Sequence, residues 1–259
     1  MAKGQAVAKP EPAPKKPAGL RIALWLGALC ALALLGGAGY FARLISDPAA
    51  IPIRKVTVEG DFVHLTQEHV QKLVSEAVHG GFFQVDVAAI RSRILDEPWL
   101  YDANVRRVWP DTISVSIREQ QAVAAWGETS LLNAEGDIFA PEASTLPAGL
   151  VRLRGPVGTE LEVLSTYRSI ESRLARLGLH VAAVSLSDRR ALVLELAGGT
   201  TVIVGKHAVE NRLARFQRVF DTLLREHWAQ IAVVDLRYTN GFAIRRRDEV
   251  PGAEKPGRG

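Results

Sequence analysis

An uninterrupted apolar run near the amino terminus constrains this chain more than any other feature. Residues Ile22 to Ala42 are 21 consecutive residues without a charge, between Arg21 and Arg43. A helix of this length is about 32 Å long, enough to cross a hydrocarbon core of about 30 Å while satisfying its own backbone hydrogen bonds. We therefore predict a transmembrane helix over residues 22–43. A cleaved signal peptide is the alternative, but its apolar region runs only about 7–15 residues.

The charges on either side of the run predict its orientation. Residues 1–21 carry five basic residues against one Glu, a net charge of +4, and the segment after the run has a weaker basic excess. Because the more basic flank of a membrane helix faces the cytoplasm, we expect the amino terminus inside and about 215 residues outside. Residues 1–21 are also rich in Pro, Ala and Lys, with almost no large apolar side chain, so we expect a disordered cytoplasmic tail.

Composition narrows the function classes. The net charge of the whole chain, +4, equals that of the tail, so the exported part is close to neutral, unlike a nucleic-acid-binding surface. Cys30 is the only cysteine and lies inside the apolar run, which leaves the exported part without disulfides or thiol chemistry. The six histidines form no pair at metal-ligand spacing, and no nucleophile or phosphate-loop motif is present. We predict no catalytic site, no metal and no cofactor.

The first exported segment predicts the order β-α-α-β-β. A strand at residues 53–59 precedes two amphipathic helices, the first capped by Thr66 and the second by Asp86. Two strands follow at residues 101–109 and 112–117, and the second of these alternates apolar and polar side chains. Two helices on one face of such a three-stranded sheet bury a single core.

The second exported segment is rich in short strands and has two helices. The helices are predicted at residues 160–177 and 208–227, where apolar side chains recur at helical spacing. The strands are predicted at residues 122–126, 131–133, 151–154, 181–186, 191–196, 201–204, 231–237 and 242–246. The apolar stripe of the second helix includes Leu223, and its four arginines, Arg212, Arg215, Arg218 and Arg225, are expected on a solvated face.

The first segment resembles a known domain. Its element order and its motifs are similar to the POTRA domain of the bacterial FtsQ/DivIB division-protein family; the motifs are Val58-Glu59-Gly60, Phe82 to Asp86, Pro98-Trp99-Leu100 and Val105 to Thr112. The resemblance implies an α+β fold with a single amino-terminal transmembrane helix. It places a POTRA domain at residues 51–120, a carboxy-terminal mixed β-rich domain with two helices at 121–247 and a flexible tail at 248–259.

The run from Val233 to Ile244 is similar to the carboxy-terminal signature of the same family. The resemblance implies a non-catalytic scaffold in the bacterial inner membrane at the division septum, with its folded domains in the periplasm and other divisome membrane proteins as neighbours. Its direct partners would be FtsB and FtsL, with FtsB bound by strand addition, and no nucleic acid or small-molecule substrate is implied. The residues carried over are Arg237, Tyr238, Asn240, Gly241 and Phe242, with Arg189 and Arg190 as a second contact for acidic residues.

Two alternatives stay open at this stage. The closing strand at residues 242–246 is either an edge that recruits a partner strand, or an edge that Arg245, Arg246 and Arg247 protect from unwanted pairing. These arginines stand where relatives often have an apolar residue, which leaves the length of the available edge undecided. The alternative function is a POTRA-containing envelope transport or assembly factor that binds polypeptides.

Overall fold

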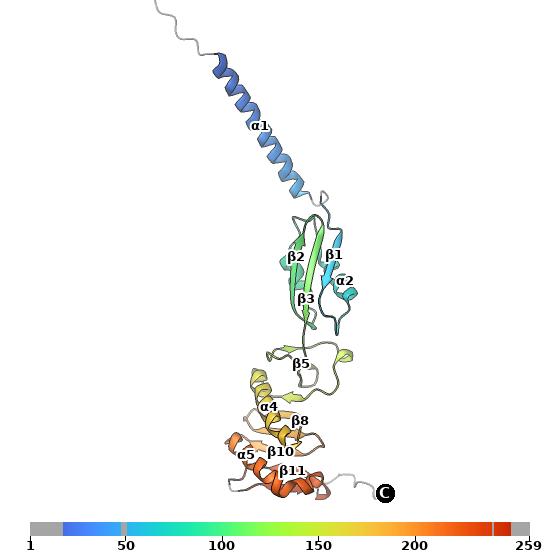
Figure 1. The fold of residues 1–259 in the computed structure, drawn as a ribbon, viewed down its shortest axis with the longest axis vertical. Helices are drawn as coiled ribbons and strands as arrows, with labels where there is room; N and C mark the ends of the chain where they lie inside the picture. The colour runs from blue at the N-terminus through green and yellow to red at the C-terminus, as the bar shows by residue number, and fades with distance from the viewer. Residues whose placement is uncertain (1–17, 48–50, 240, 250–259) are drawn as a thin grey trace, which may run out of the picture.

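The computed structural model describes residues 18–47, 51–239 and 241–249, arranged as a helix and two stacked domains along one elongated molecule (Figure 1). Helix α1 (Ala18–Ser46) contains the predicted span, and its residues 22–43 are long and apolar enough to cross a membrane. The large side chains of this stretch are exposed, as expected of a helix that packs against lipid. Most of the predicted tail at residues 1–21 lies outside the described residues.

The first domain has the predicted β-α-α-β-β order. Its elements are β1 (Lys55–Glu59), α2 (Gln67–Ala77), α3 (Val87–Ile94), β2 (Leu100–Val108) and β3 (Thr112–Glu119). Both predicted caps are confirmed, since Thr66 accepts a hydrogen bond from the His69 amide and Asp86 accepts bonds from the amides of Ala88 and Ala89. Each cap satisfies amides that have no partner within their own helix.

One core holds the first domain together. The strand order is β1-β3-β2, with β1 parallel to β3 and β2 antiparallel to it. The period of two along β3 directs Ile113, Val115 and Ile117 into one core cluster with Val74 of α2 and Ile90 of α3. Both helices therefore cover the same face of this sheet, as predicted.

The second domain is built on a nine-stranded sheet with the order β12-β11-β10-β9-β8-β7-β4-β5-β6. The strands are β4 (Ala124–Trp126), β5 (Ser130–Leu132), β6 (Ile138–Phe139), β7 (Arg152–Arg154), β8 (Val181–Leu186), β9 (Leu192–Leu196), β10 (Thr201–Gly205), β11 (Ile231–Asp235) and β12 (Ala243–Arg246). The helices are α4 (Glu160–Leu174) and α5 (Val209–Val219), with short helical turns at η1 (Ala143–Thr145), η2 (Ala175–Leu177), η3 (Phe220–Leu224), η4 (Arg225–Gln230) and η5 (Arg247–Glu249). All eight predicted strands are present, and β6 is an additional one.

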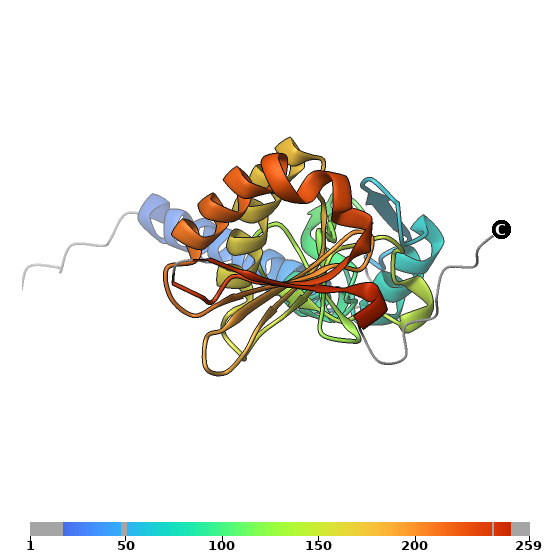
Figure 2. The same cartoon turned by 90° about the horizontal axis from the view of Figure 1, so that it is seen from below.

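Both long helices of this domain lie side by side on one face of the large sheet (Figure 2). Leu164 and Phe216 from the helices share a core cluster with Leu194, Val202 and Val234 from the strands. On β8 to β11, the strand residues that point to the opposite face are partly buried or exposed, whereas Leu131 of β5 and Phe139 of β6 are buried in a separate cluster with Trp99. The domain is therefore a two-layer α/β structure with one open sheet face.

The prediction that Leu223 is buried in the core is wrong. The helical stripe predicts that Leu223 is buried, but Leu223 is 68% exposed, and its neighbour Leu224 is only 5% exposed. The reason is η3, a turn of π-helix that directly follows α5. A π-turn holds one more residue than an α-turn, so the inward position moves on by one residue. The flexible tail expected at residues 248–259 stays a prediction: Asp248 and Glu249 belong to η5, and the rest of the segment lies outside the described residues.

The two domains meet at the end of β3. The Glu119 carboxylate accepts hydrogen bonds from the amides of Val63, His64 and Leu65. The His64 ring stacks on Trp99 with ring centroids 3.6 Å apart, and Trp99 in turn packs edge-on against Phe139 of β6. This junction is the end of the first domain that lies farthest from α1 (Figure 1).

Candidate partner-binding edge

The last strand of the chain forms one edge of the nine-stranded sheet. Among the described strands, only β11 pairs with β12, and all four residues of β12 are exposed. Ile244 lies opposite the fully buried Val234, on the helix-covered face of the sheet, yet it is 44% exposed. The Arg246 amide donates to Glu249 Oε2 at 3.2 Å, so the Glu249 side chain occupies one end of this edge. An uncovered apolar side chain on an edge strand is typical of an edge that accepts another strand.

The predicted site residues lie on the loop between β11 and β12. Arg237 and Tyr238 follow β11 directly, and the Tyr238 side chain is 58% exposed. Phe242 comes just before β12 and packs partly against the core of the domain. Gly241 lies between them, and Asn240 lies outside the described residues. The loop thus presents one exposed aromatic ring and anchors a second one.

Arg237 has a carboxylate partner within its own chain. Its guanidinium donates to both carboxylate oxygens of Asp235, with Nη2 2.6 Å from Oδ2 and Nε 2.9 Å from Oδ1. These hydrogen bonds hold the pKa of Asp235 below its usual value of 3.8, and Arg212 adds a smaller attraction. The role predicted for Arg237, pairing with a partner carboxylate, stays a prediction, because a partner would have to share a guanidinium that is already engaged.

The Asp235–Arg237 pair makes the loop sensitive to acid. A carboxyl group whose pKa is depressed in the folded chain contributes stability that is present above its unfolded pKa and lost as the pH falls through the folded pKa. We expect the Asp235 carboxyl resonance to titrate with a midpoint below 3.8, and Arg237→Gln to move that midpoint upward. Asp102, whose pKa is lowered by Arg91 in the first domain, is the control and should not respond. An unchanged Asp235 midpoint in the variant would contradict this assignment.

Two arginines of α5 bind the backbone of this loop, contrary to the prediction that they are solvated. Arg215 donates to the carbonyl oxygens of Leu236, Tyr238 and Thr239 at 3.2, 2.8 and 2.7 Å. Carbonyl groups of an irregular loop need such donors, because no neighbouring strand supplies them. The other two arginines of the predicted set, Arg218 and Arg225, are exposed as expected.

Arg212 extends this clamp to the neighbouring strand. Its guanidinium donates to the carbonyl oxygens of Val204 at 2.7 Å and of Arg237 at 3.0 Å. A Cβ at Gly205 would lie 2.7 Å from Arg212 Nη1, and Gly205 has a φ of +84°. Glycine at this position thus leaves room for the guanidinium. Sequence spacing alone shows that both arginines lie off the apolar stripe, but not that loop carbonyls face them.

Arg189 and Arg190 lie at the same end of the sheet as the 236–242 loop. The turn between β8 and β9 carries both, and the register of β9, β10 and β11 brings this turn and the ends of β10 and β11 to one side. Arg190 pairs with Glu162 of α4 at 2.9 Å. Lys206 and His207, which the sequence analysis did not select, follow β10 between the two predicted groups. This end of the sheet is therefore rich in cations.

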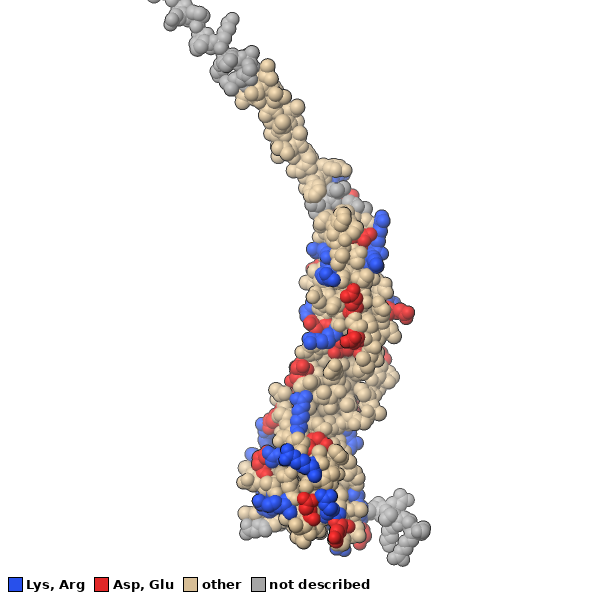
Figure 3. Space-filling model, viewed as in Figure 1, with Lys and Arg blue, Asp and Glu red and all other residues tan. Residues whose placement is uncertain are grey.

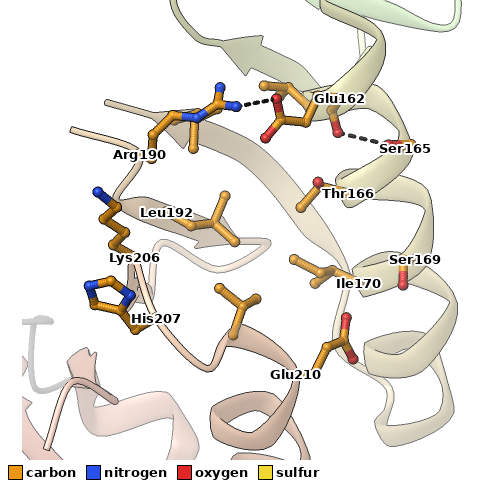
Figure 4. A pocket seen from close by; sticks show the side chains of 13 residues that line it. Glu162, Ser165, Thr166, Ser169, Ile170, Arg190, Leu192, Lys206, His207 and Glu210 are labelled. Carbon is orange, nitrogen blue, oxygen red and sulfur yellow. Dashed lines mark hydrogen bonds and ion pairs between the residues drawn. The ribbon is translucent and has the colours of Figure 1, made fainter. Parts of the chain in front are cut away.

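A cleft of about 560 Å³ opens at this end, between α4 and the loops that follow β8 and β10. Figure 4 shows Arg190, Lys206 and His207 along one side and the α4 residues Glu162 and Ile170 along the other. Its floor is apolar, and its rim carries both signs of charge. Within the described part of the chain, no group of three or more His, Cys, Asp or Glu side chains is placed to hold a metal ion.

In a comparison with known protein families, each of the two domains matches a family model. The model of the POTRA domain, FtsQ-type, matches residues 51–120, and the model of the cell division protein FtsQ/DivIB, C-terminal, matches residues 124–237. The cell division protein FtsQ of Allochromatium vinosum is 34% identical over 228 residues, which cover 88% of this chain and 90% of that protein. The chain belongs to the FtsQ/DivIB family.

Other FtsQ proteins match over similar lengths. The protein of Coxiella burnetii is 32% identical over 217 residues, covering 82% of this chain and 88% of its own length. That of Vibrio cholerae is 32% identical over 218 residues, covering 83% of this chain and 84% of its own length. The FtsQ/DivIB relationship supports a role in cell division over the transport alternative. The carboxy-terminal match ends at residue 237, so the edge from Tyr238 to Arg246 lies beyond it.

Proposed function

We propose that this protein is a non-catalytic scaffold of the division machinery that recruits the FtsB–FtsL pair through β12. The observation that carries the proposal is that β12 is an exposed strand at the edge of the large sheet, paired with β11 alone among the described strands. A strand of FtsB added to this edge would form backbone hydrogen bonds with β12 and cover Ile244. Recruitment of this pair is how the protein would link early and late division proteins and influence septal wall synthesis.

The charge of the sheet end fits a partner with acidic side chains. Arg189, Arg190, Lys206 and Arg237 lie at this end, and Arg190 and Arg237 already bind carboxylates of the chain itself. The geometry thus suits carboxylate binding by arginine, which a partner Glu or Asp can share or replace. Tyr238 supplies an exposed ring with a polar hydroxyl, the kind of side chain that is enriched among interface hot spots.

The proposal includes the placement of the chain in the cell. The basic tail before α1 would lie in the cytoplasm, and the two domains would lie in the periplasm of a single-pass inner-membrane protein at the septum. What supports this placement is the net charge of +4 in residues 1–21 together with one helix of membrane-spanning length. We further propose the boundaries 51–120 and 121–247 for the two domains.

Tyr238→Ala should weaken binding of the soluble FtsB–FtsL segment at least about thirtyfold, since truncating a hot-spot side chain costs about 2 kcal/mol or more. Titration calorimetry with the full-length chain in nanodiscs measures this loss. Val63→Ala is the control, because Val63 is also an exposed apolar residue but lies in the first domain. Equal affinities of wild type and Tyr238→Ala would place the interface elsewhere, and no binding by folded wild type would refute the scaffold proposal.

A further inference from the structure

Three segments of the first domain converge at the end that faces α1. The Arg54 amide donates to the Asp111 carbonyl at 2.9 Å, and the Phe82 amide donates to the Ile51 carbonyl at 2.9 Å. Strand pairing sets Lys55 opposite Thr112. The start of β1, the loop after α2 and the β2–β3 turn therefore form one surface. We name this surface the POTRA tip and define it by Arg54, Lys55, Phe83, Arg107 and Trp109.

The POTRA tip exposes two aromatic rings. Trp109 is 73% exposed and Phe83 is 43% exposed, whereas Phe82 and Trp99 of the same domain are buried. Phe83 is held in place by an edge-on contact with the buried Phe82, whose ring centroid is 5.4 Å away. Tryptophan is enriched where proteins meet the headgroup layer of a membrane, because its ring is apolar and its N–H is polar.

Chain connectivity keeps the POTRA tip close to the bilayer. Helix α1 ends at Ser46, and Ile51, whose carbonyl accepts from the Phe82 amide at the tip, lies five positions further along the chain, with four residues between them. Even a fully extended chain of five residues spans only about 18 Å. The span itself ends near Arg43, and the headgroup layer adds several ångströms to the hydrocarbon core. Every part of this surface is thus tethered within reach of lipid headgroups.

The charges of this end match anionic lipid. Its cations outnumber its carboxylates by five to three: they are Arg43, Arg54, Lys55, Arg106 and Arg107 against Asp47, Asp86 and Asp111. The Asp86 carboxylate is engaged as the cap of α3, and Arg107 keeps one bond to the Val85 carbonyl at 2.6 Å. Blue atoms lie on both flanks of the domain end next to α1 in Figure 3. Cations held beside an anionic membrane surface are attracted to its lipid phosphates.

We propose that the POTRA tip rests in the headgroup layer of the bilayer that α1 crosses, with Trp109 and Phe83 inserted between lipids and Arg54 and Lys55 against lipid phosphates. This goes beyond the partner-binding function and rests on α1 as a membrane span. Contact at the tip gives the first domain a second attachment to the membrane, in addition to its covalent connection to α1. The domain then keeps a fixed tilt to the membrane, which the second domain inherits through Trp99, because this ring packs against Phe139 and donates to Thr145 Oγ1.

The test measures whether bromine atoms near the headgroups quench Trp109. The full-length chain is placed in nanodiscs of phosphatidylethanolamine and phosphatidylglycerol, with and without acyl chains brominated close to the headgroup. Subtracting the emission of Trp109→Phe from that of wild type isolates the Trp109 signal. We expect brominated lipid to lower this signal by about half or more, as for other interfacial tryptophans. Trp228 of the second domain is the control. Subtracting the emission of Trp228→Phe from that of wild type isolates the Trp228 signal, which should be the same in brominated and plain lipid.

A second comparison separates specific contact from chance collision. Arg54→Gln with Lys55→Gln should reduce the quenching of Trp109 in anionic nanodiscs while leaving the fold unchanged, because both side chains are exposed. An equal Trp109 signal in brominated and plain lipid would overturn the proposal. Equal quenching in wild type and the double variant would overturn the part assigned to the two cations.

Discussion

Trp99→Ala should lower the free energy of unfolding by about 3–5 kcal/mol, the range observed when a buried aromatic side chain is truncated. Trp99 is only 2% exposed, and it belongs to the first domain at the entry to β2. Its ring packs on His64 on one side and on Phe139 of the second domain on the other. Its Nε1 donates to Thr145 Oγ1 at 3.0 Å. The substitution removes contacts within the first domain and most of the apolar contact between the two domains.

The form of the unfolding curve should change as well. With the Trp99 contacts gone, the domains keep separate cores and should unfold in two transitions instead of one. Circular dichroism during denaturant titration of the full-length chain in detergent measures both effects. Val157→Ala, at a fully exposed side chain, is the control and should change stability by less than about 0.5 kcal/mol. A loss below about 1 kcal/mol in Trp99→Ala would show that the junction does not depend on this ring.

Arg215→Gln should release the 236–242 loop and lower stability by about 3 kcal/mol. The arginine satisfies three loop carbonyls at once, and hydrogen bonds to a charged donor contribute about 1.5–3 kcal/mol each without being additive. Glutamine cannot reach all three. Hydrogen exchange of the amides from Arg237 to Ala243 should accelerate, because the loop and then β12 would open more often.

The matched control for this prediction is Arg218→Gln, which changes an exposed arginine on the same helix. Arg215→Lys keeps the charge but loses the planar fork, so it should show an intermediate exchange rate. If strand addition at β12 needs an ordered loop, the affinity for the partner should be highest in wild type, lower in Arg215→Lys and lowest in Arg215→Gln. Unchanged exchange in Arg215→Gln would show that the clamp does not order the edge.

Local patterns predicted the elements of this chain well, for physical reasons that the structure makes plain. Apolar spacing identified both helices of each domain, and Thr66 and Asp86 cap their helices as expected because capping depends on residues close in sequence. The same local pattern failed at Leu223, where a π-turn shifted the inward face by one residue. β6, only two residues long, carries too little pattern to be recognised.

The candidate site was harder to predict, since it depends on contacts between distant segments. The loop at Arg237 and Tyr238 was identified through family resemblance, but its supports were not. Arg215 contacts residues more than 20 positions away, and Asp235 engages Arg237 through a local pair that the sequence does not distinguish from a free arginine. The order and direction of the strands place the turn at Arg190 at the same end of the sheet as this loop. Predicted strand positions along the sequence do not show this, because they do not say which strands pair.

The stacking of the two domains has a consequence for any partner that is itself anchored in the same bilayer. The first domain stands next to α1, and β11 lies at the far end of the molecule (Figure 1). A segment that pairs with β12 must therefore be held at that same height above the lipid by a stalk of its own. Partners with shorter stalks are excluded however well their strand fits, because a linker too short to span two sites brings the effective concentration close to zero. On the proposed function, the protein would select partners by the length of their stalk as well as by sequence.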